Sequence, residues 1–175
     1  GAGAAVIGRR SRPHEVSVRA SVLRSGEPWD SSSPHVWGFG LVESTARAAY
    51  EQAGIGPSDI DVLECHDAFT IGEIVTTEAL GLAREGEGHL LLRNGHTRLG
   101  GPQVVNPSGG LLSGGQPLGS TGLTQTAEIV WQLQGRAGQR QTGSPRLGLV
   151  ETMGGGVAGI DGNACVITVL ERPNG

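Results

Sequence analysis

Lysine is missing from this 175-residue sequence, in which all 13 basic residues are arginine. The chain's own side chains therefore cannot form a Schiff base with a carbonyl substrate. The 17 acidic residues give a net charge of −4, which disfavours nucleic acid or an anionic membrane surface as a partner. The sequence also lacks a signal peptide and any apolar run of about 18 residues. We expect a soluble, cytoplasmic chain without nucleic-acid or membrane partners.

Cysteine is scarce as well. Cys65 and Cys165 each lie within an apolar run, which favours reduced, buried thiols over the alternatives of a disulfide or a metal site. The sequence contains no CxxC or HExxH motif, and its five histidines show no ligand spacing. We therefore expect no metal site.

Glycine, in contrast, is abundant, with 31 residues concentrated in short loops. Such loops occur where the backbone turns sharply or approaches a ligand closely. The chain is long enough for one domain or for half of a larger one.

The hydrophobic pattern predicts alternating strands and helices. The sequence Asn94-Gly95 indicates a hairpin within residues 89–101, with a solvated loop as the alternative. Together these elements predict an α/β domain with a mixed β-sheet covered by helices. We expect strands at 4–8, 16–24, 61–66, 146–152 and 163–171, and helices at about 39–53, 70–82 and 120–135. The inner faces of the last two helices are expected to carry Ile71, Ile74, Val75, Ala79 and Leu82, and Leu123, Ala127, Val130 and Leu133.

The first candidate site residue is His66, at the end of the strand predicted for residues 61–66. Ligands of open α/β sheets bind beyond the carboxyl ends of the strands. Strand alternation places Glu64 and His66 on one face and Cys65 on the other, which weakens a Cys–His dyad. The alternative is a structural histidine.

The second candidate is Gln116, in the loop "GGLLSGGQPLGSTG". The glycine spacing is similar to a phosphate-binding loop, but Ser120 stands where the required lysine would be, so nucleotide binding is rejected. Ser120 is a plausible N-cap, and the following helix directs its positive end at the loop. The Gln116 carboxamide can donate hydrogen bonds to a carbonyl oxygen. The alternative is a tight turn with a structural glutamine.

The third candidate is the loop "TMGGGVAG", residues 152–159, whose bare N–H groups could stabilise an oxyanion. A simple turn is the alternative. Three strand-end loops of this kind favour one shared pocket.

A family resemblance is carried by "ECHDAFTIGEIVTTEALGL", "VNPSGGLLSGGQPLGSTGLTQTAEIVWQLQG" and "ETMGGGVAGIDGNACVITVLE". In order and spacing these stretches resemble the C-terminal half of a thiolase, of the sterol-carrier-protein-x or lipid-transfer type with a His-Asp-x-Phe motif. The resemblance covers about residues 4 to 171. It implies that residues 1–175 form a thiolase-like C-terminal domain, one half of a five-layer αβαβα arrangement.

The resemblance also implies partners and a substrate. Thiolases have an N-terminal half of similar fold that carries the nucleophilic cysteine, and the opening "GAGAAVIG" resembles the segment that joins the halves. We therefore expect that half on another chain or a missing segment, together with a thiolase-type dimer. A CoA thioester is the implied substrate, with no covalently bound cofactor.

Site roles follow from the same resemblance. His66 matches the histidine of the His-Asp-x-Phe motif, which helps to form one oxyanion hole. Ala68 and Phe69 match residues that line the pantetheine tunnel. Gly154 matches a glycine whose N–H contributes to the second oxyanion hole.

Two positions depart from the thiolase pattern. Gln116 replaces the histidine of Gly-His-Pro, and Thr152 replaces the acid/base cysteine. Neither side chain is a base near neutral pH, and a positioned acid or base contributes about 10²–10⁴-fold to a rate. The resemblance therefore implies catalysis by His66, Gln116, Thr152 and Gly154 in atypical C–C bond chemistry, not ordinary thiolysis.

Other functions remain open at this point. A glutamine in this loop is also similar to the steroid side-chain aldolases, which work with a small partner carrying a zinc ribbon and an OB-fold. The tyrosines of those enzymes are not found here, because His66 and Phe69 occupy the corresponding motif. The alternatives are thus a retro-aldolase subunit or a non-catalytic acyl-CoA-binding or scaffold subunit.

Overall fold

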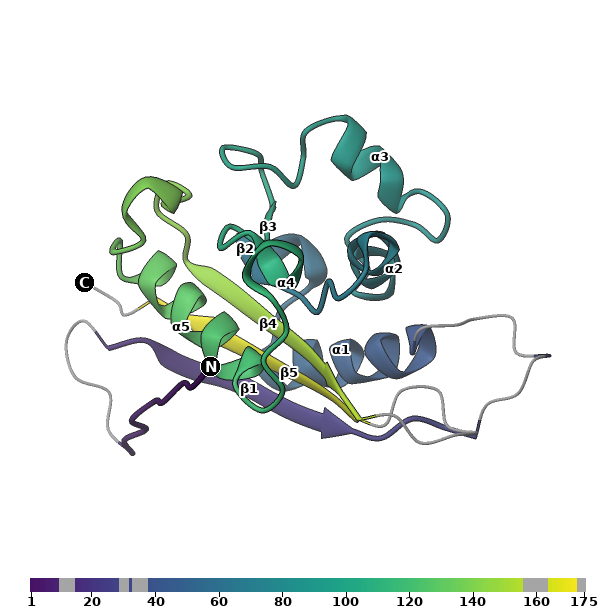
Figure 1. The fold of residues 1–175 in the computed structure, drawn as a ribbon, viewed down its shortest axis with the longest axis horizontal. Coiled ribbons are helices and arrows are strands. Elements are labelled where there is room, and N and C mark those ends of the chain that lie inside the picture. Colours follow the sequence, from purple (N-terminus) through teal and green to yellow (C-terminus); the bar gives the residue numbers. More distant parts are fainter. Residues whose placement is uncertain (10–14, 29–31, 33–37, 156–163, 173–175) are drawn as a thin grey trace.

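A computed structural model describes residues 1–9, 15–28, 32, 38–155 and 164–172 (Figure 1). Five strands form one sheet in the order β1-β5-β4-β2-β3. The β1–β5 and β5–β4 pairs are antiparallel, whereas β4–β2 and β2–β3 are parallel. The predicted mixed sheet is therefore confirmed. The strands are β1 (Ser17–Arg24), β2 (Val62–Glu64), β3 (Val104–Val105), β4 (Leu147–Gly154) and β5 (Ala164–Glu171).

Helices cover both faces of this sheet (Figure 1). On one face, α1 (Phe39–Ala53) and α2 (Thr70–Ala79) enclose the larger apolar core. On the other face, α5 (Thr121–Leu133) packs against β2 and β4 over a smaller core. Two short helices, α3 (Gly88–Arg93) and α4 (Gly110–Gly114), lie in the connections that lead from α2 to β3 and from β3 to α5. No helix in the described ranges is long and apolar enough to cross a membrane.

Helix α1 follows its sequence pattern closely, and its bounds are those predicted. Val42, Ala46, Ala49 and Ala53 are buried against the sheet. Gly54 ends the helix in the left-handed conformation, with φ of 68°, which glycine adopts without the strain of a side chain.

Two predicted elements are wrong. Residues 4–8 form no strand, and Val6 and Ile7 are exposed, because apolar β-formers make a strand only where a ladder partner is available. Residues 88–93 form α3 in place of a hairpin arm. Asn94-Gly95 ends that helix, with Gly95 at φ of 70°. The left-handed geometry that suits a hairpin turn also suits a helix terminus.

The inner faces predicted for α2 and α5 are also partly wrong. On α2, Ile71 is exposed, while Ala79 is buried as expected. On α5, Leu123 is 39% exposed, and only Leu133 of the predicted stripe is fully buried. The buried face of α5 instead carries Thr121, Gln125, Glu128, Ile129 and Gln132.

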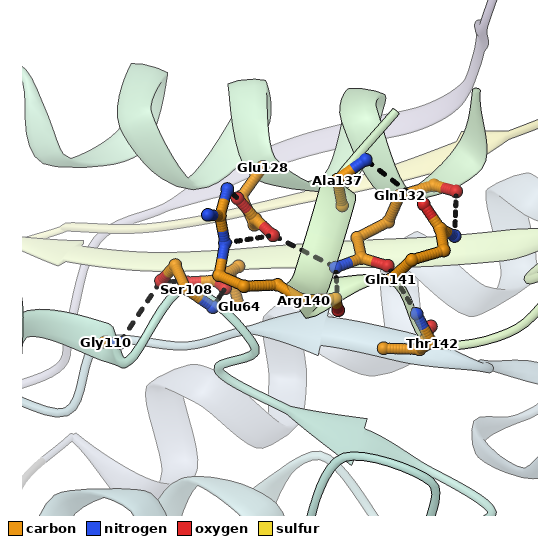
Figure 2. Close-up of polar contacts among 9 residues, drawn as sticks. All are labelled: Glu64, Ser108, Gly110, Glu128, Gln132, Ala137, Arg140, Gln141 and Thr142. Atoms are coloured by element: carbon orange, nitrogen blue, oxygen red, sulfur yellow. Dashed lines mark hydrogen bonds and ion pairs between the residues drawn. The ribbon is translucent and has the colours of Figure 1, made fainter. Parts of the chain in front are cut away.

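Polar side chains are tolerated on this face of α5 because each finds hydrogen-bond partners. Figure 2 shows the network at the C-terminal end of the helix. Arg140 donates to both carboxylate oxygens of Glu128, at 2.8 and 3.2 Å. Gln132 donates to Glu128 Oε1 and to the Arg140 carbonyl oxygen, and its own Oε1 accepts from Thr142 N–H. The network ties α5 to the segment that leads into β4.

Candidate active site

The end of β2 is held by side chains where the sheet ladder stops. The last pair in the β2–β4 register is Glu64 with Val150. Beyond it, the Cys65 N–H donates to Asn106 Oδ1 at 2.8 Å, and the His66 N–H donates to Glu151 Oε2 at 2.9 Å. These two contacts satisfy buried backbone donors and fix the position from which the His66 side chain projects.

His66 and Gln116 lie in contact although 50 residues separate them in the sequence. The Gln116 side-chain nitrogen is 3.1 Å from His66 Nε2. His66 is 7% exposed, whereas Gln116 is exposed in the loop between α4 and α5. The structure therefore brings together two of the predicted site residues, one buried and one exposed.

The protonation of His66 follows from its surroundings. Burial lowers its pKa below 6.5, and the neighbouring Asp67 charge opposes the shift only in part. The imidazole is thus neutral at pH 7. An amide nitrogen only donates, so His66 Nε2 accepts from Gln116 and the ring proton lies on Nδ1. His66 Nδ1 is buried and has no hydrogen-bond partner within the described part of the chain.

Buried acidic side chains accept hydrogen bonds from the loop that carries Gln116. Glu64 accepts from Ser108 N–H at 2.9 Å and from Ser108 Oγ at 2.8 Å (Figure 2). Asp67 accepts from Leu111 N–H at 2.6 Å. A side chain at Gly110 would collide with the Asp67 carboxylate. The loop therefore runs against the end of β2, and this approach places Gln116 beside His66.

Sequence reasoning missed these supporting residues. Glu64, Asp67 and Asn106 are buried polar residues beside a short apolar strand. A charge within an apolar strand is a usable signal, because a buried carboxylate needs partners. Ser120 occupies the N-cap position of α5, but its hydroxyl donates to the Pro117 carbonyl oxygen and does not cap the helix as expected.

Thr152 reaches the same edge of the sheet from β4. Two residues beyond the Glu64–Val150 pair, the neighbouring parallel strands lead to His66 and to Thr152. The Thr152 hydroxyl donates to Gln125 Oε1 at 2.5 Å. This contact fixes its proton toward α5 and leaves its oxygen lone pairs as acceptors.

The other predicted site residues lie at the end of β4 and in the segment between β2 and α2. Gly154 is the exposed last residue of β4, and a Cβ added there would meet no atom of the described residues within 4 Å. The remainder of the third glycine loop, residues 156–159, lies outside the described residues. Ala68 is half-buried and Phe69 is 59% exposed where the chain passes from His66 into α2.

The thiols near the site are poorly suited to nucleophilic chemistry. Cys65 and Cys165 are free and buried, as the sequence indicates. Burial raises the pKa of both thiols well above the ordinary value, so neither is a thiolate at neutral pH. What the site offers is a pair of hydrogen-bonding groups at one point, an arrangement that can bind a polarised oxygen.

Comparison with known proteins identifies the family of this chain. The family model described as thiolase C-terminal domain-like matches residues 30–167. Sterol carrier protein 2 of Rattus norvegicus is 49% identical over 123 residues, which is 70% of this chain and 22% of that protein. An acetyl-CoA acetyltransferase of Methanothermobacter thermautotrophicus is 41% identical over 140 residues, or 80% of this chain and 37% of the relative. The chain thus spans less than two fifths of either relative.

A solved structure shares the fold. The Ltp2-ChsH2(DUF35) aldolase aligns with a TM-score of 0.70 and 24% identity, covering 91% of this chain and 40% of that chain. The chain belongs to the thiolase C-terminal domain-like family. The thiolase-like α/β fold and the similarity to sterol carrier proteins, both inferred from the sequence motifs, are confirmed.

Proposed function

We propose that this chain, as a member of the thiolase C-terminal domain-like family, forms one half of an enzyme that makes or breaks a C–C bond in acyl-CoA thioesters. The observation that supports this proposal is the 3.1 Å contact between Gln116 and a buried, neutral His66. Two side chains that can each present an N–H to the same point suit the oxygen of a thioester.

The role proposed for the pair is to hold and polarise the thioester oxygen. The bound oxygen replaces the contact between the two side chains, so that Gln116 donates one N–H and His66 donates through Nε2. This requires the ring proton of His66 on Nε2. Because Nδ1 has no partner among the described residues, that tautomer breaks no hydrogen bond at Nδ1. Negative charge on the oxygen of an enolate is stabilised by the same two donors.

Ordinary thiolysis is not what we propose. Relative to the thiolase pattern, Gln116 and Thr152 replace a histidine and a cysteine that move protons. Thr152 donates its proton to Gln125, so its oxygen can accept a hydrogen bond from a water or a substrate hydroxyl. Gly154 is the exposed last residue of β4, and its backbone N–H is proposed to contact the substrate oxygen. The exposed Phe69, with Ala68, is proposed to contact the pantetheine arm.

The second half of the enzyme is proposed as the main partner. The outer face of α5 exposes Leu123 and Trp131, and residues 1–3 run along the start of this helix, with Gly3 against Leu123. We propose that an N-terminal half of similar fold covers this face, completes the five-layer arrangement and supplies any nucleophilic cysteine. A thiolase-type dimer, and a small zinc-ribbon and OB-fold partner, are further parts of the proposal.

Thioester binding by the full-length protein tests the proposed site. Gln116→Ala removes one donor to the oxygen, so the Kd for acetyl-CoA or hexanoyl-CoA, measured by calorimetry, should rise about tenfold. Free CoA, which has no thioester oxygen, should bind wild type and variant equally. Gln52→Ala, an exposed change on α1, is the matched control. Equal thioester affinity in wild type and Gln116→Ala would contradict the proposal.

A non-catalytic acyl-CoA-binding subunit is the second candidate. The same two replacements favour it. The side chains of Gln116 and Thr152 can form hydrogen bonds to a substrate, but they cannot accept a proton as the histidine and cysteine of the thiolase pattern do. Incubation of the assembled protein with a 3-oxoacyl-CoA or a 3-hydroxyacyl-CoA separates the candidates. Thioester binding without C–C cleavage or formation, measured by mass spectrometry of the products, would favour the binding subunit.

A further inference from the structure

Glu151 is a carboxylate without exposure to solvent, in the part of β4 that borders the site. Its side chain lies on the α1 face of the sheet, where Cys165 Sγ of β5 is 3.8 Å from Oε1. None of the ion pairs among the described residues includes Glu151. A buried carboxylate without a cation is costly in free energy. Its position next to Thr152 therefore indicates that Glu151 has a function in the site.

Glu151 contacts both sides of the proposed site. Its Oε2 accepts the His66 N–H at 2.9 Å. Its main-chain oxygen accepts from Gln125 Nε2 at 3.2 Å, and Gln125 Oε1 in turn accepts the Thr152 hydroxyl. The donor end of the Gln125 amide is thereby assigned to Glu151 and the acceptor end to Thr152. One residue thus supports His66 through its side chain and Thr152 through its backbone.

We propose that Glu151 is the positioning residue of this site, and that ionisation of its carboxyl group sets how firmly His66 is held opposite Gln116. A hydrogen bond to a carboxylate is shorter and stronger than one to a neutral carboxyl group. The expected effect of Glu151 on substrate binding rests on the proposed function, whereas its expected effect on the His66 hydrogen bond does not.

The surroundings of Glu151 place its ionisation near neutral pH. Burial raises its pKa to about 7, with a smaller upward contribution from the charge of Asp67, while the His66 N–H acts in the opposite direction. Cys165 on β5 and Cys65 at the end of β2 are the other titratable groups coupled to it, and both keep their protons in this range. Burial lowers the pKa of the His66 imidazole below 6.5, so a change of the amide signal at lower pH that remains in Glu151→Gln belongs to the ring.

The amide signal of His66 tests the proposal without any substrate. In full-length protein labelled with 15N-histidine, the His66 amide proton should move downfield as the pH rises from 5 to 9, with a midpoint near 7. Glu151→Gln keeps an acceptor oxygen but cannot ionise, so this transition should disappear. Glu64→Gln is the matched control, because burial also raises the pKa of Glu64 to about 7 while its carboxylate binds Ser108; the His66 transition should persist there. Persistence in Glu151→Gln would overturn the proposal.

A binding measurement separates this inference from the proposed function. Glu151→Leu removes the acceptor for the His66 N–H and should weaken hexanoyl-CoA binding about tenfold, with Glu151→Gln restoring most of the affinity. If Gln116→Ala weakens binding but the His66 transition is unchanged in Glu151→Gln, the positioning role is contradicted and the proposed function stands. If the His66 transition is lost in Glu151→Gln but Gln116→Ala leaves binding unchanged, the proposed function fails and the positioning role stands. Should Glu151→Leu not fold, the Glu151→Gln titration decides.

Discussion

Helices α1 and α5 cover opposite faces of the same sheet by different means. α1 buries mainly small apolar residues such as Ala46 and Ala49. α5 buries Gln125, Glu128 and Gln132 beside Ile129 and Leu133. Apolar packing needs only the right face and volume, whereas buried polar groups need particular partners. The α5 face of the sheet is thus the one held by specific hydrogen bonds.

The largest expected effect comes from breaking the ion pair on the α5 face. Arg140→Ala leaves the buried carboxylate of Glu128 without its cation, which should lower the free energy of unfolding by about 4 kcal/mol. Chemical denaturation measures the loss. Arg136→Ala, an exposed change in the same connection, is the control. A loss no larger than that of the control would mean that α5 is held by its apolar residues, as α1 is.

A smaller effect is expected from pH. Burial raises the pKa of Glu151 from 4.5 to about 7. Because the folded-state pKa is the higher one, the contribution to stability is complete below pH 4.5 and is lost as the pH rises through about 7. The loss corresponds to about 3 kcal/mol for this group. Denaturation between pH 4 and 8.5 should show a shallower decline in Glu151→Gln than in wild type, whereas Glu43→Gln, at an exposed position of α1, should leave the decline unchanged. An equal decline in all three proteins would contradict the prediction.

On the α1 face, an apolar truncation should have a moderate effect. Val42 is buried against the sheet core, so Val42→Ala should cost about 2 kcal/mol through lost burial and the cavity left behind. The same denaturation series measures it, with Arg47→Ala on the exposed side of α1 as control. A loss no larger than that of the control would mean that apolar burial by α1 does not stabilise this face.

The smallest effect on stability is expected from a substitution of the exposed residue of the candidate site. Gln116 is exposed, so Gln116→His should change the free energy of unfolding by less than about 0.5 kcal/mol. An imidazole there can accept a thiol proton. If the other half supplies a nucleophilic cysteine, the burst of acyl transfer from acyl-CoA, followed by intact mass, should be faster in Gln116→His. Gln116→Asn is the control, since it cannot accept that proton; an equal burst in both variants would show that Gln116 does not occupy the histidine's place.

Local signals in the sequence were sufficient for most elements of the fold. The apolar spacing and Gly54 predicted α1 to its bounds, and strands β4 and β5 were predicted to within two residues at each end. The short strand β3 and the helices α3 and α4 were not predicted as such. Asn94-Gly95 was misread, because the same left-handed conformation serves a hairpin turn and a helix end.

The sequence by itself determined the family, the mixed α/β layering and the residues at the strand ends, because periodicity and short motifs are local properties of the chain. Only the tertiary structure decided that His66 meets Gln116, that Glu151 supports His66, and that α5 turns Gln125 and Glu128 inward. Each of these contacts joins residues from different elements. A buried polar side chain is stable only where another element supplies a hydrogen-bond partner. The sequence pattern of one helix or strand does not indicate where that partner lies.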